Sequence, residues 1–384
     1  MADQANDTLR RTPLHDLHQE FGGKMVPFAG YEMPVQFEGV KPEHLWTREH
    51  AGLFDVSHMG PCFLYLKEGL GQPGAHEKIS GLIERLVPSA ISTLKPGQGR
   101  LTVLLNDEGG ILDDLIITRM PDANLDGMLY IVVNGAVKHD DWALIREKLA
   151  GEAELQTADD RILVALQGPE AEAVLTPHFP EAAELSFMRC AHVQKGGERY
   201  MVSRCGYTGE DGFELLLPNN ETGLGYVRGL LADERVKPIG LGARDSLRLE
   251  AGLCLYGHDM DASRTPVEAD LQWVIQKSRR ERADFPGAEK ILKQIADGPA
   301  EKRVGILPLE RAPAREGTEI HVDGQLVGMV TSGGFGPSTD GPVAMGYVRA
   351  DLATPGTKID LMVRGKARAG EVAALPFVQP NYKR

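Results

Sequence analysis

The hydrophobic pattern first predicts a helix close to the N-terminus. From Leu14 to Phe21, apolar residues recur at intervals of three and four positions, which places them on one face of a helix. Thr12 stands where an N-cap residue is expected, and Pro13 follows at the first helical position. Gly22 ends the pattern. We therefore expect a helix between Thr12 and Gly22.

Similar patterns predict more helices, with β-type apolar runs between them. The helical segments are 41–52, 76–86, 136–149, 170–175 and 221–233. Because helices and strands follow one another in mixed order, we expect the first two thirds of the chain to be α+β with largely antiparallel sheets.

The pattern changes near the last quarter of the chain. Charged residues and a Phe-Pro-Gly turn interrupt the apolar runs over 278–290. From Arg303 onward, short β-type segments alternate with turn clusters about every ten residues. We therefore expect a linker over 278–302 and a separate small β-barrel or sandwich over 303–384.

Composition narrows the classes of function. A chain of 384 residues is longer than one hydrophobic core usually organises, and its 44 glycines favour a β-rich protein with tight turns. The formal net charge of -13 argues against a nucleic-acid binder. No apolar run is long enough to span a membrane. The start lacks the apolar core of a signal peptide, and early aspartates fit poorly with a transit peptide, so we expect a cytoplasmic protein.

Cysteine and histidine spacing predicts no metal site. The four cysteines are widely separated and form no C-x-x-C pair, so we expect free buried thiols. His15 and His18 lie one helical turn apart, but no Cys, Asp or Glu stands at ligand spacing, so we expect them at the surface.

Two short motifs partly match a dinucleotide-binding loop and a hydrolase triad, but neither match is complete. GLGARDS, residues 240–246, begins like a dinucleotide-binding loop but lacks the third glycine. FDVSH offers Asp55, Ser57 and His58 as a hydrolase triad would, but in a strand Ser57 and His58 would point to opposite faces.

Two adjacent carboxylates in GGILDDLIIT, residues 109–118, lie inside an apolar run that is typical of a strand. Strand alternation sends Asp113 and Asp114 to opposite faces, so they are not a proton-sharing dyad. At most one can enter a given cavity, and the other is expected to meet solvent or a cap. The spacing leaves open whether the inward carboxylate is structural or catalytic.

Further charged residues follow in CGYTGEDGFELLLP, residues 205–218, and in GLGARDSLRLEAG, residues 240–252. Glu214 stands in an apolar strand, where it either has a partner or faces water at an edge. The charges from Arg244 to Glu250 crowd one helical segment, and intrahelical ion pairing explains much of that.

Eight segments together resemble the glycine cleavage system T protein family, the aminomethyltransferases. In order, they are TPLHDLHQEFGGKMVPFAGYEMPVQF, FDVSHMG, GGILDDLIIT, ALQGPEA, CGYTGEDGFEL, GLGARDSLRLEAGLCLYG, TSGGFGPS and AMGYV. They extend the resemblance from about Thr12 to Tyr382.

The resemblance implies an enzyme that takes the aminomethyl group on the dihydrolipoyl arm of H protein and passes its carbon to tetrahydrofolate. The products would be 5,10-methylenetetrahydrofolate, ammonia and the reduced arm. It also implies a three-domain cloverleaf with folate in a central channel: a folate-binding region over 1–277, with a second α+β unit over roughly 56–154 inserted in the first, and a C-terminal β-barrel. No metal or nucleotide cofactor is implied.

The resemblance also assigns site residues. Asp114 would be the catalytic carboxylate near N10 of the folate, a fixed anion that stabilises the positive charge developing on the transferred carbon. Glu214 would accept the paired N–H groups of the pterin. Tyr207, Arg244 and Tyr382 would contact folate, with Tyr382 closing the site from the C-terminal tail. Asn134 is a candidate for the channel wall.

Two other functions share this fold. One is a folate-binding assembly factor without turnover, whose K-G-C-Y-x-G-Q-E segment is replaced here by LEAGLCLYGHDM. The other is a tetrahydrofolate-dependent demethylase acting on a small O-methyl or S-methyl donor.

Overall fold

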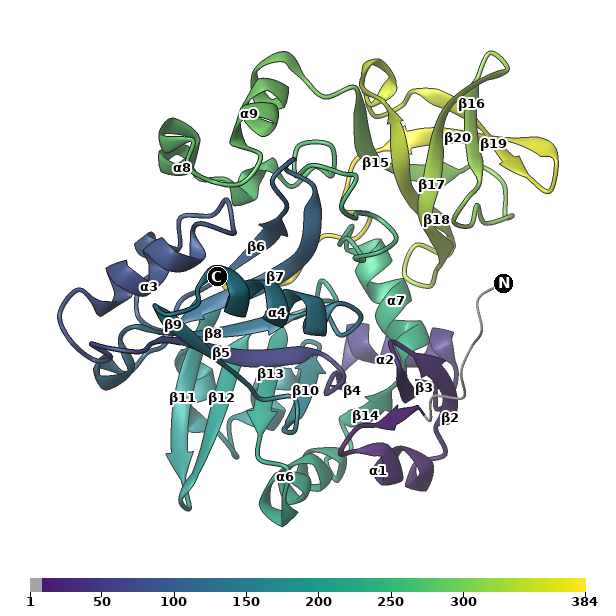
Figure 1. The fold of residues 1–384 in the computed structure, drawn as a ribbon. Helices are drawn as coiled ribbons and strands as arrows, with labels where there is room; N and C mark the ends of the chain where they lie inside the picture. The colour runs from purple at the N-terminus through teal and green to yellow at the C-terminus, as the bar shows by residue number, and fades with distance from the viewer. Residues whose placement is uncertain (1–8) are drawn as a thin grey trace.

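The computed structural model describes residues 9–384 and has a mixed α+β architecture with several sheets and a separate barrel (Figure 1). Almost all strand pairs are antiparallel; the exceptions are one pair in the small N-terminal sheet and one edge pair in the largest sheet. The predicted fold class and the C-terminal barrel are confirmed.

A five-stranded antiparallel sheet carries the two adjacent aspartates. Its strands, in spatial order, are β6 (Gly99–Leu105), β7 (Ile111–Arg119), β8 (Met128–Val133), β5 (Gly60–Leu66) and β9 (Ala153–Thr157). One face packs on α3 (Ala75–Ile83) and α4 (Lys138–Lys148) through a buried cluster that includes Leu115, Ile117 and Trp142. Burial of this apolar face fixes the register of β7.

A six-stranded sheet lies against the other face of the first. Its strands, in order, are β11 (Arg189–Lys195), β12 (Glu198–Arg204), β13 (Gly212–Leu217), β10 (Ile162–Gln167), β4 (Ala51–Asp55) and β14 (Val236–Ile239). Tyr130 and Val132 of β8 belong to one buried cluster with Ala165 of β10 and Leu216 of β13, so the two sheets share a core. The outer face is covered by α5 (Ala171–Leu175) and α6 (Glu221–Leu231), whose apolar residues join the second core.

The N-terminal segment adds a small sheet and two helices. The strands are β1 (Arg10–Arg11), β3 (Tyr31–Gln36) and β2 (Lys24–Phe28), and the helices are α1 (His15–Glu20) and α2 (Val40–Glu49). The N-cap prediction for Thr12 is wrong. Leu14 occupies the cap position without a side-chain hydrogen bond, and the Thr12 hydroxyl instead donates to Asp55 at 2.6 Å.

The C-terminal region is a closed six-stranded barrel. In order around the barrel, the strands are β15 (Glu301–Pro308), β18 (Gly341–Arg349), β17 (Gln325–Gly336), β16 (Glu319–Val322), β19 (Lys358–Val363) and β20 (Lys366–Ala373). The segment expected to be a linker is mostly helical, with α8 (Lys277–Arg282) and α9 (Ala288–Asp297).

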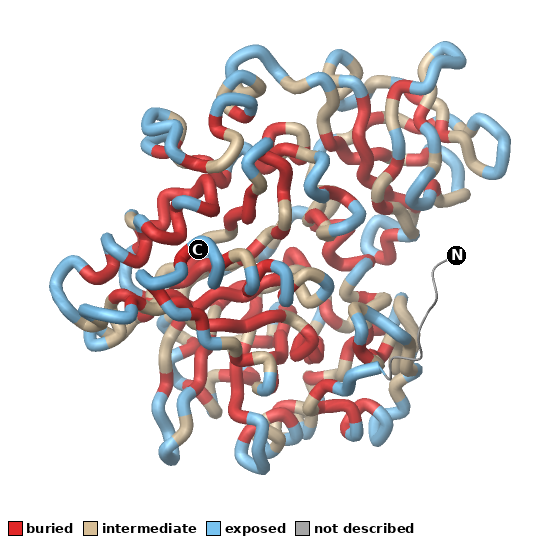
Figure 2. The backbone as a smooth tube through the Cα atoms, viewed as in Figure 1, coloured by how far each residue is buried: buried red, intermediate tan, exposed pale blue. Residues whose placement is uncertain are grey.

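The helix α7 (Leu241–Glu250) lies between the barrel and the rest of the chain, in contact with β17 and β18 on one side and with α2 and β3 on the other. Its second half is buried, as are most strands of the two facing sheets (Figure 2). After the barrel, the chain returns to the six-stranded sheet, where the Asn381 N–H donates to Gly209 and the Phe187 N–H donates to Lys383. The central helix and this tail hold the barrel against the site described next.

Candidate functional site

The adjacent aspartates of β7 occupy opposite faces of the five-stranded sheet, as alternation predicts. Asp113 is fully buried, at 0% exposure, on the face that packs against α4. Asp114 is half-buried and shares its face with Ile116, which lines the space between the two sheets. The expectation that the other aspartate meets solvent or a cap is wrong, because Asp113 is enclosed by the helices that cover the sheet.

Asn134 joins the two carboxylates. It follows the last residue of β8 and stands opposite Asp114 in the register that pairs Ile116 with Val132. Its side-chain Nδ2 donates at 2.8 Å to an oxygen of Asp113 and at 2.8 Å to an oxygen of Asp114. Its backbone N–H donates to the second oxygen of Asp113 at 2.9 Å. Gly135 allows this turn, since a Cβ there would lie 2.7 Å from the carbonyl oxygen of His58.

Burial is the main cause of the unusual titration of these acids. It raises the pKa of Asp114 to about 7, with a further contribution from the charge of Asp113. Burial and Asp141 of α4 together hold the pKa of Asp113 well above its usual range. A raised pKa lowers the fraction of Asp114 that is ionised, so burial works against the fixed anion that the resemblance implies.

Arg244 and Tyr207 form a second part of the site. The Arg244 guanidinium, on α7, lies over the Tyr207 ring at 4.7 Å from its centroid. The Tyr207 hydroxyl donates to the carbonyl of Cys254, which fixes the ring in place. Among residues 9–384, no carboxylate lies within salt-bridge distance of Arg244, and burial lowers its pKa. Its N–H donors are therefore left for a ligand.

Glu214 faces the space between the two sheets rather than an outer edge. It lies in β13 between β12 and β10, and lines a small cavity of about 10 Å³ with Tyr130 and Ile116. Burial raises its pKa, opposed by the positive charge of Arg244. Within the described chain its carboxylate forms no salt bridge, so most of its acceptor capacity is open.

Tyr382 forms no hydrogen bond or ring contact with the other predicted site residues among residues 9–384. Its ring stacks on Phe187, with centroids 4.1 Å apart and planes 8° apart. The neighbouring Asn381 donates from its side chain to Glu210 at 3.2 Å, and Glu210 accepts from Arg48 at 2.8 Å. The tail is thus held at the edge of the six-stranded sheet by its own contacts.

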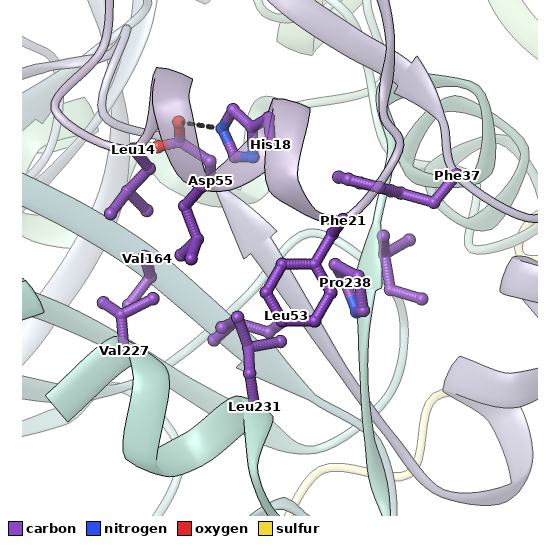
Figure 3. Close-up of a pocket in the computed structure, with 12 residues that line it drawn as sticks. Leu14, His18, Phe21, Phe37, Leu53, Asp55, Val164, Val227, Leu231 and Pro238 are labelled. Carbon is purple, nitrogen blue, oxygen red and sulfur yellow. Dashed lines mark hydrogen bonds and ion pairs between the residues drawn. The ribbon is translucent and has the colours of Figure 1, made fainter. Parts of the chain in front are cut away.

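The two N-terminal histidines are buried, which corrects the expectation of surface positions. His18 Nε2 donates to the Asp55 carboxylate at 2.7 Å, and His15 Nε2 lies 2.8 Å from the Glu32 carboxylate. Figure 3 shows the His18–Asp55 pair beside an apolar cavity of about 20 Å³, which is large enough for one water and too small for a substrate. Their i, i+3 spacing gave no sign of these partners, because both lie on other elements.

The FDVSH segment holds no hydrolase triad, but not for the reason predicted. Strand alternation does not apply to Ser57 and His58, because the strand β4 ends at Asp55. The Ser57 hydroxyl donates to the carbonyl of Leu163 at 3.1 Å, not to a histidine. His58 is buried, which lowers its pKa to about 4, and its Nδ1 has no partner among residues 9–384. Ser57 therefore lacks a base.

Asp141 is the one member of the carboxyl cluster that sequence analysis missed. It stands in the first turn of α4, where acidic residues are common because their negative charge interacts favourably with the positive end of the helix dipole. Only its distance of seven residues from Asn134 could have suggested a shared site. Across residues 9–384, no group of three or more His, Cys, Asp or Glu side chains is arranged to hold a metal ion, and no helix is long and apolar enough to cross a membrane.

Comparisons with known proteins agree over nearly the whole chain. Residues 14–279 match the family model of the GCVT N-terminal domain, and residues 302–379 match that of the glycine cleavage T-protein C-terminal barrel domain. The probable mitochondrial aminomethyltransferase of Schizosaccharomyces pombe is 42% identical, covering 98% of this chain and 95% of that protein. The mitochondrial aminomethyltransferase of Dictyostelium discoideum is 40% identical, covering 99% and 95%.

A solved structure gives the same result. The crystal structure of glycine cleavage system aminomethyltransferase T from Bartonella henselae superposes with a TM-score of 0.90 at 42% identity, covering 98% of this chain and 100% of that one.

The expectation of a cytoplasmic location is overturned by these relatives. The proteins from S. pombe and D. discoideum are named mitochondrial, whereas the structural relative is bacterial. Relatives that are about equally similar to this chain thus differ in location, and the composition of this chain does not assign one.

Proposed function

The chain belongs to the glycine cleavage T-protein family and is an aminomethyltransferase, and from that premise we propose that its carbon acceptor is tetrahydrofolate and that Asp114 carries the proton transfers. The observation that carries the assignment of Asp114 is its position on the face of β7 that borders the space between the two sheets, where Asn134 donates to its carboxylate at 2.8 Å; burial also raises its pKa to about 7. A general acid–base group works best when its pKa lies near the working pH.

The reaction requires such a group. Transfer breaks the bonds from the carbon to the lipoyl sulfur and to the amine, and forms bonds from that carbon to N5 and N10 of tetrahydrofolate. Two protons move from the acceptor nitrogens to the departing sulfur and amine, so the reaction balances without an oxidant. Asp114 can accept one of these protons as a carboxylate and return it as an acid. In its ionised form it also stabilises positive charge on the carbon.

The open hydrogen-bonding groups fit a planar heterocycle such as the pterin. The Glu214 carboxylate offers two acceptor oxygens inside the protein, and the Arg244 guanidinium offers unpaired donors beside the Tyr207 ring. A carboxylate that accepts two parallel N–H bonds gives both affinity and orientation. We assign pterin binding to Glu214 and Arg244, with Tyr207 as the surface against which Arg244 is held.

Asn134 and Tyr382 complete the proposed folate site. Asn134 positions the Asp114 oxygen by its 2.8 Å hydrogen bond, so that its role is to orient the catalytic carboxylate. Tyr382 would close the site from the tail, and its stacking on Phe187 supplies a fixed platform for that role.

The domain division is proposed on similar grounds. The five-stranded sheet and its helices use residues between 60 and 157, and the barrel strands lie between 301 and 373. These ranges support a folate-binding region over 1–277 with an inserted unit near 56–154, a connection over 278–302 that contains α8 and α9, and a barrel domain over 303–384.

We propose lipoylated H protein as the donor, because the family reaction belongs to the glycine cleavage system. The names of the relatives, all aminomethyltransferases, do not favour an assembly factor or a demethylase.

The test is ammonia release from aminomethylated H protein, with and without tetrahydrofolate, by the wild type, Asp114→Asn and the control Asp107→Asn. Asp107 is exposed in the turn before β7, so its replacement makes the same chemical change away from the site. We expect release to depend on tetrahydrofolate and to fall by about 10² to 10⁴ in Asp114→Asn alone. Folate-independent release at the same rate would contradict the acceptor, and an unchanged Asp114→Asn would contradict the catalytic assignment.

A further inference from the structure

We propose that Arg48 is a positioning residue for the folate site: its guanidinium holds the loop that carries Tyr207 and, through Glu210, the C-terminal tail that carries Tyr382. The proposal rests on the folate contacts proposed for these two tyrosines. Arg48 itself does not need to touch the substrate for this role.

The guanidinium of Arg48 donates to four acceptors from three other parts of the chain. Its Nη1 donates at 2.8 Å to the carbonyl of Thr208 and at 2.8 Å to the carboxylate of Glu210, both in the loop 205–211 between β12 and β13. Its Nη2 donates at 3.1 Å to Glu250 of α7, and its Nε donates at 3.3 Å to the hydroxyl of Ser338 in the barrel. One side chain of α2 therefore connects the loop, the central helix and the barrel.

The carboxylates that face Arg48 are shielded from water. The side chains of Glu210 and Glu250 are 3% and 0% exposed, and that of Arg48 is 10% exposed. Among residues 9–384, Arg48 is the only salt-bridge partner of Glu210. A buried carboxylate without a cationic partner is costly, so this ion pair fixes the position of the loop relative to α2.

The loop places the Tyr207 ring beside Arg244. Thr208, the next residue, is fastened at two points: its carbonyl accepts from Arg48, and its hydroxyl donates at 2.9 Å to Gln167 of β10. The Arg244 guanidinium lies over the Tyr207 ring. A shift of the Thr208 carbonyl would therefore move the ring against which Arg244 is held.

The C-terminal tail rests on the same loop. The backbone N–H of Asn381 donates at 2.9 Å to the carbonyl of Gly209, and its side chain donates at 3.2 Å to Oε2 of Glu210. Glu210 thus accepts from Arg48 with one oxygen and from the tail with the other. Because Tyr382 follows Asn381 directly, its position depends on Arg48 through this shared carboxylate.

A purely structural role for Arg48 predicts different kinetics. Loss of folded protein lowers kcat and leaves KM unchanged. A displaced loop and tail weaken the binding of tetrahydrofolate, so KM for this substrate rises while kcat at saturating folate and KM for H protein stay the same.

The test compares kcat and KM for tetrahydrofolate in Arg48→Lys, Asn381→Ala and the controls Arg199→Lys and Asn219→Ala. Lysine keeps the positive charge between the buried acids, but one ammonium cannot reach the loop, α7 and the barrel together. We expect KM to rise about tenfold in Arg48→Lys and less in Asn381→Ala, with kcat kept. Arg199 and Asn219 are exposed, so their replacement should change neither constant.

Asn381→Ala removes only the side-chain contact between the tail and Glu210, and so tests the proposal even where Arg48→Lys is unstable. A fall in kcat without a rise in KM, in either variant, would show a structural role alone and overturn the proposal.

Hydrogen exchange makes the test independent of turnover. In Arg48→Lys, peptides from the loop 205–211 and from the tail 377–384 should exchange faster than in the wild type, whereas Asn381→Ala should loosen the tail alone. Unchanged exchange of the loop in Arg48→Lys would overturn the proposal. Faster exchange of both segments with kcat and KM unchanged would instead refute the folate contacts proposed for Tyr207 and Tyr382, and Arg48 would still position the loop and tail.

Discussion

The carboxylate of Glu250, at the end of α7, accepts a hydrogen bond of 2.8 Å from the backbone N–H of Ser338 in the barrel. The same carboxylate lies 3.1 Å from His44 and 3.1 Å from Arg48, both on α2. Burial alone would raise the pKa of Glu250, but the hydrogen bonds from His44 and Ser338 outweigh it and lower the pKa to about 2. One buried acid therefore joins the barrel to the N-terminal region.

Glu250→Gln should lower the free energy of unfolding at neutral pH by about 3 kcal/mol. The folded-state pKa is below the ordinary value of 4.5, so the stabilisation is present above that pH and is lost as pH falls toward about 2. Urea unfolding at pH 7 and at about pH 3 measures this difference. Glu49→Gln, at an exposed position of α2, is the control and should match the wild type. An equal loss at both pH values would contradict the ion-pair explanation.

Asp114→Asn should make the protein more stable while it removes activity. The pKa of Asp114 is raised from 3.8 to about 7, so the folded state favours its protonated form. The wild type therefore loses stability as pH rises through this range, and the neutral variant does not. We expect a gain of about 4 kcal/mol near pH 8 that disappears below about pH 4. Thermal unfolding across this range checks the sign; a variant less stable at pH 8 would contradict it.

Glu214→Gln should weaken tetrahydrofolate binding about tenfold or more, because one charged hydrogen-bond acceptor is replaced by a neutral group that also presents donors. Titration calorimetry measures the affinity directly. Glu154→Gln makes the same change at an exposed strand position and should bind like the wild type. Equal affinity in the two variants would remove Glu214 from the folate site.

Asp55→Asn should lower the free energy of unfolding by about 3 kcal/mol, because it leaves a buried histidine without its anionic partner. Burial alone would raise the pKa of Asp55, but hydrogen bonds from His18, Ser57 and Thr12 outweigh it and lower the pKa. Chemical denaturation at pH 7 measures the loss, with Asp107→Asn as the control. A loss below 1 kcal/mol would mean that the pair contributes little.

Features that depend on neighbours in the sequence could be predicted. The opposite faces of Asp113 and Asp114 follow from strand geometry alone, and the short β-type segments predicted after Arg303 are barrel strands. The strand Lys366–Ala373 was not predicted, because Lys366, Arg368 and Glu371 leave only a short apolar pattern along it. The site residues came from family resemblance, since spacing alone left the roles of Asp114 and Glu214 open.

Features that depend on residues far apart in the sequence could not be predicted. Thr12 looked like a helix cap, but Asp55, 43 positions away, takes its hydroxyl. Intrahelical pairing explains only part of α7: Asp245 does pair with Arg248 at 2.8 Å, whereas Glu250 binds α2 and the barrel. In each case a tertiary partner outweighs the local preference, and the sequence does not identify that partner.

The route of the last ten residues limits how the barrel can move. Because the chain enters the barrel from α9 and, on leaving it, is fastened at Gly209 and Phe187, both ends of this domain are anchored to the same body. For the barrel to swing about one connection, its other connection to the rest of the chain would have to be released. These two backbone hydrogen bonds must break before the C-terminal peptide can leave the six-stranded sheet, so the tail restrains the barrel at its exit as α9 does at its entry.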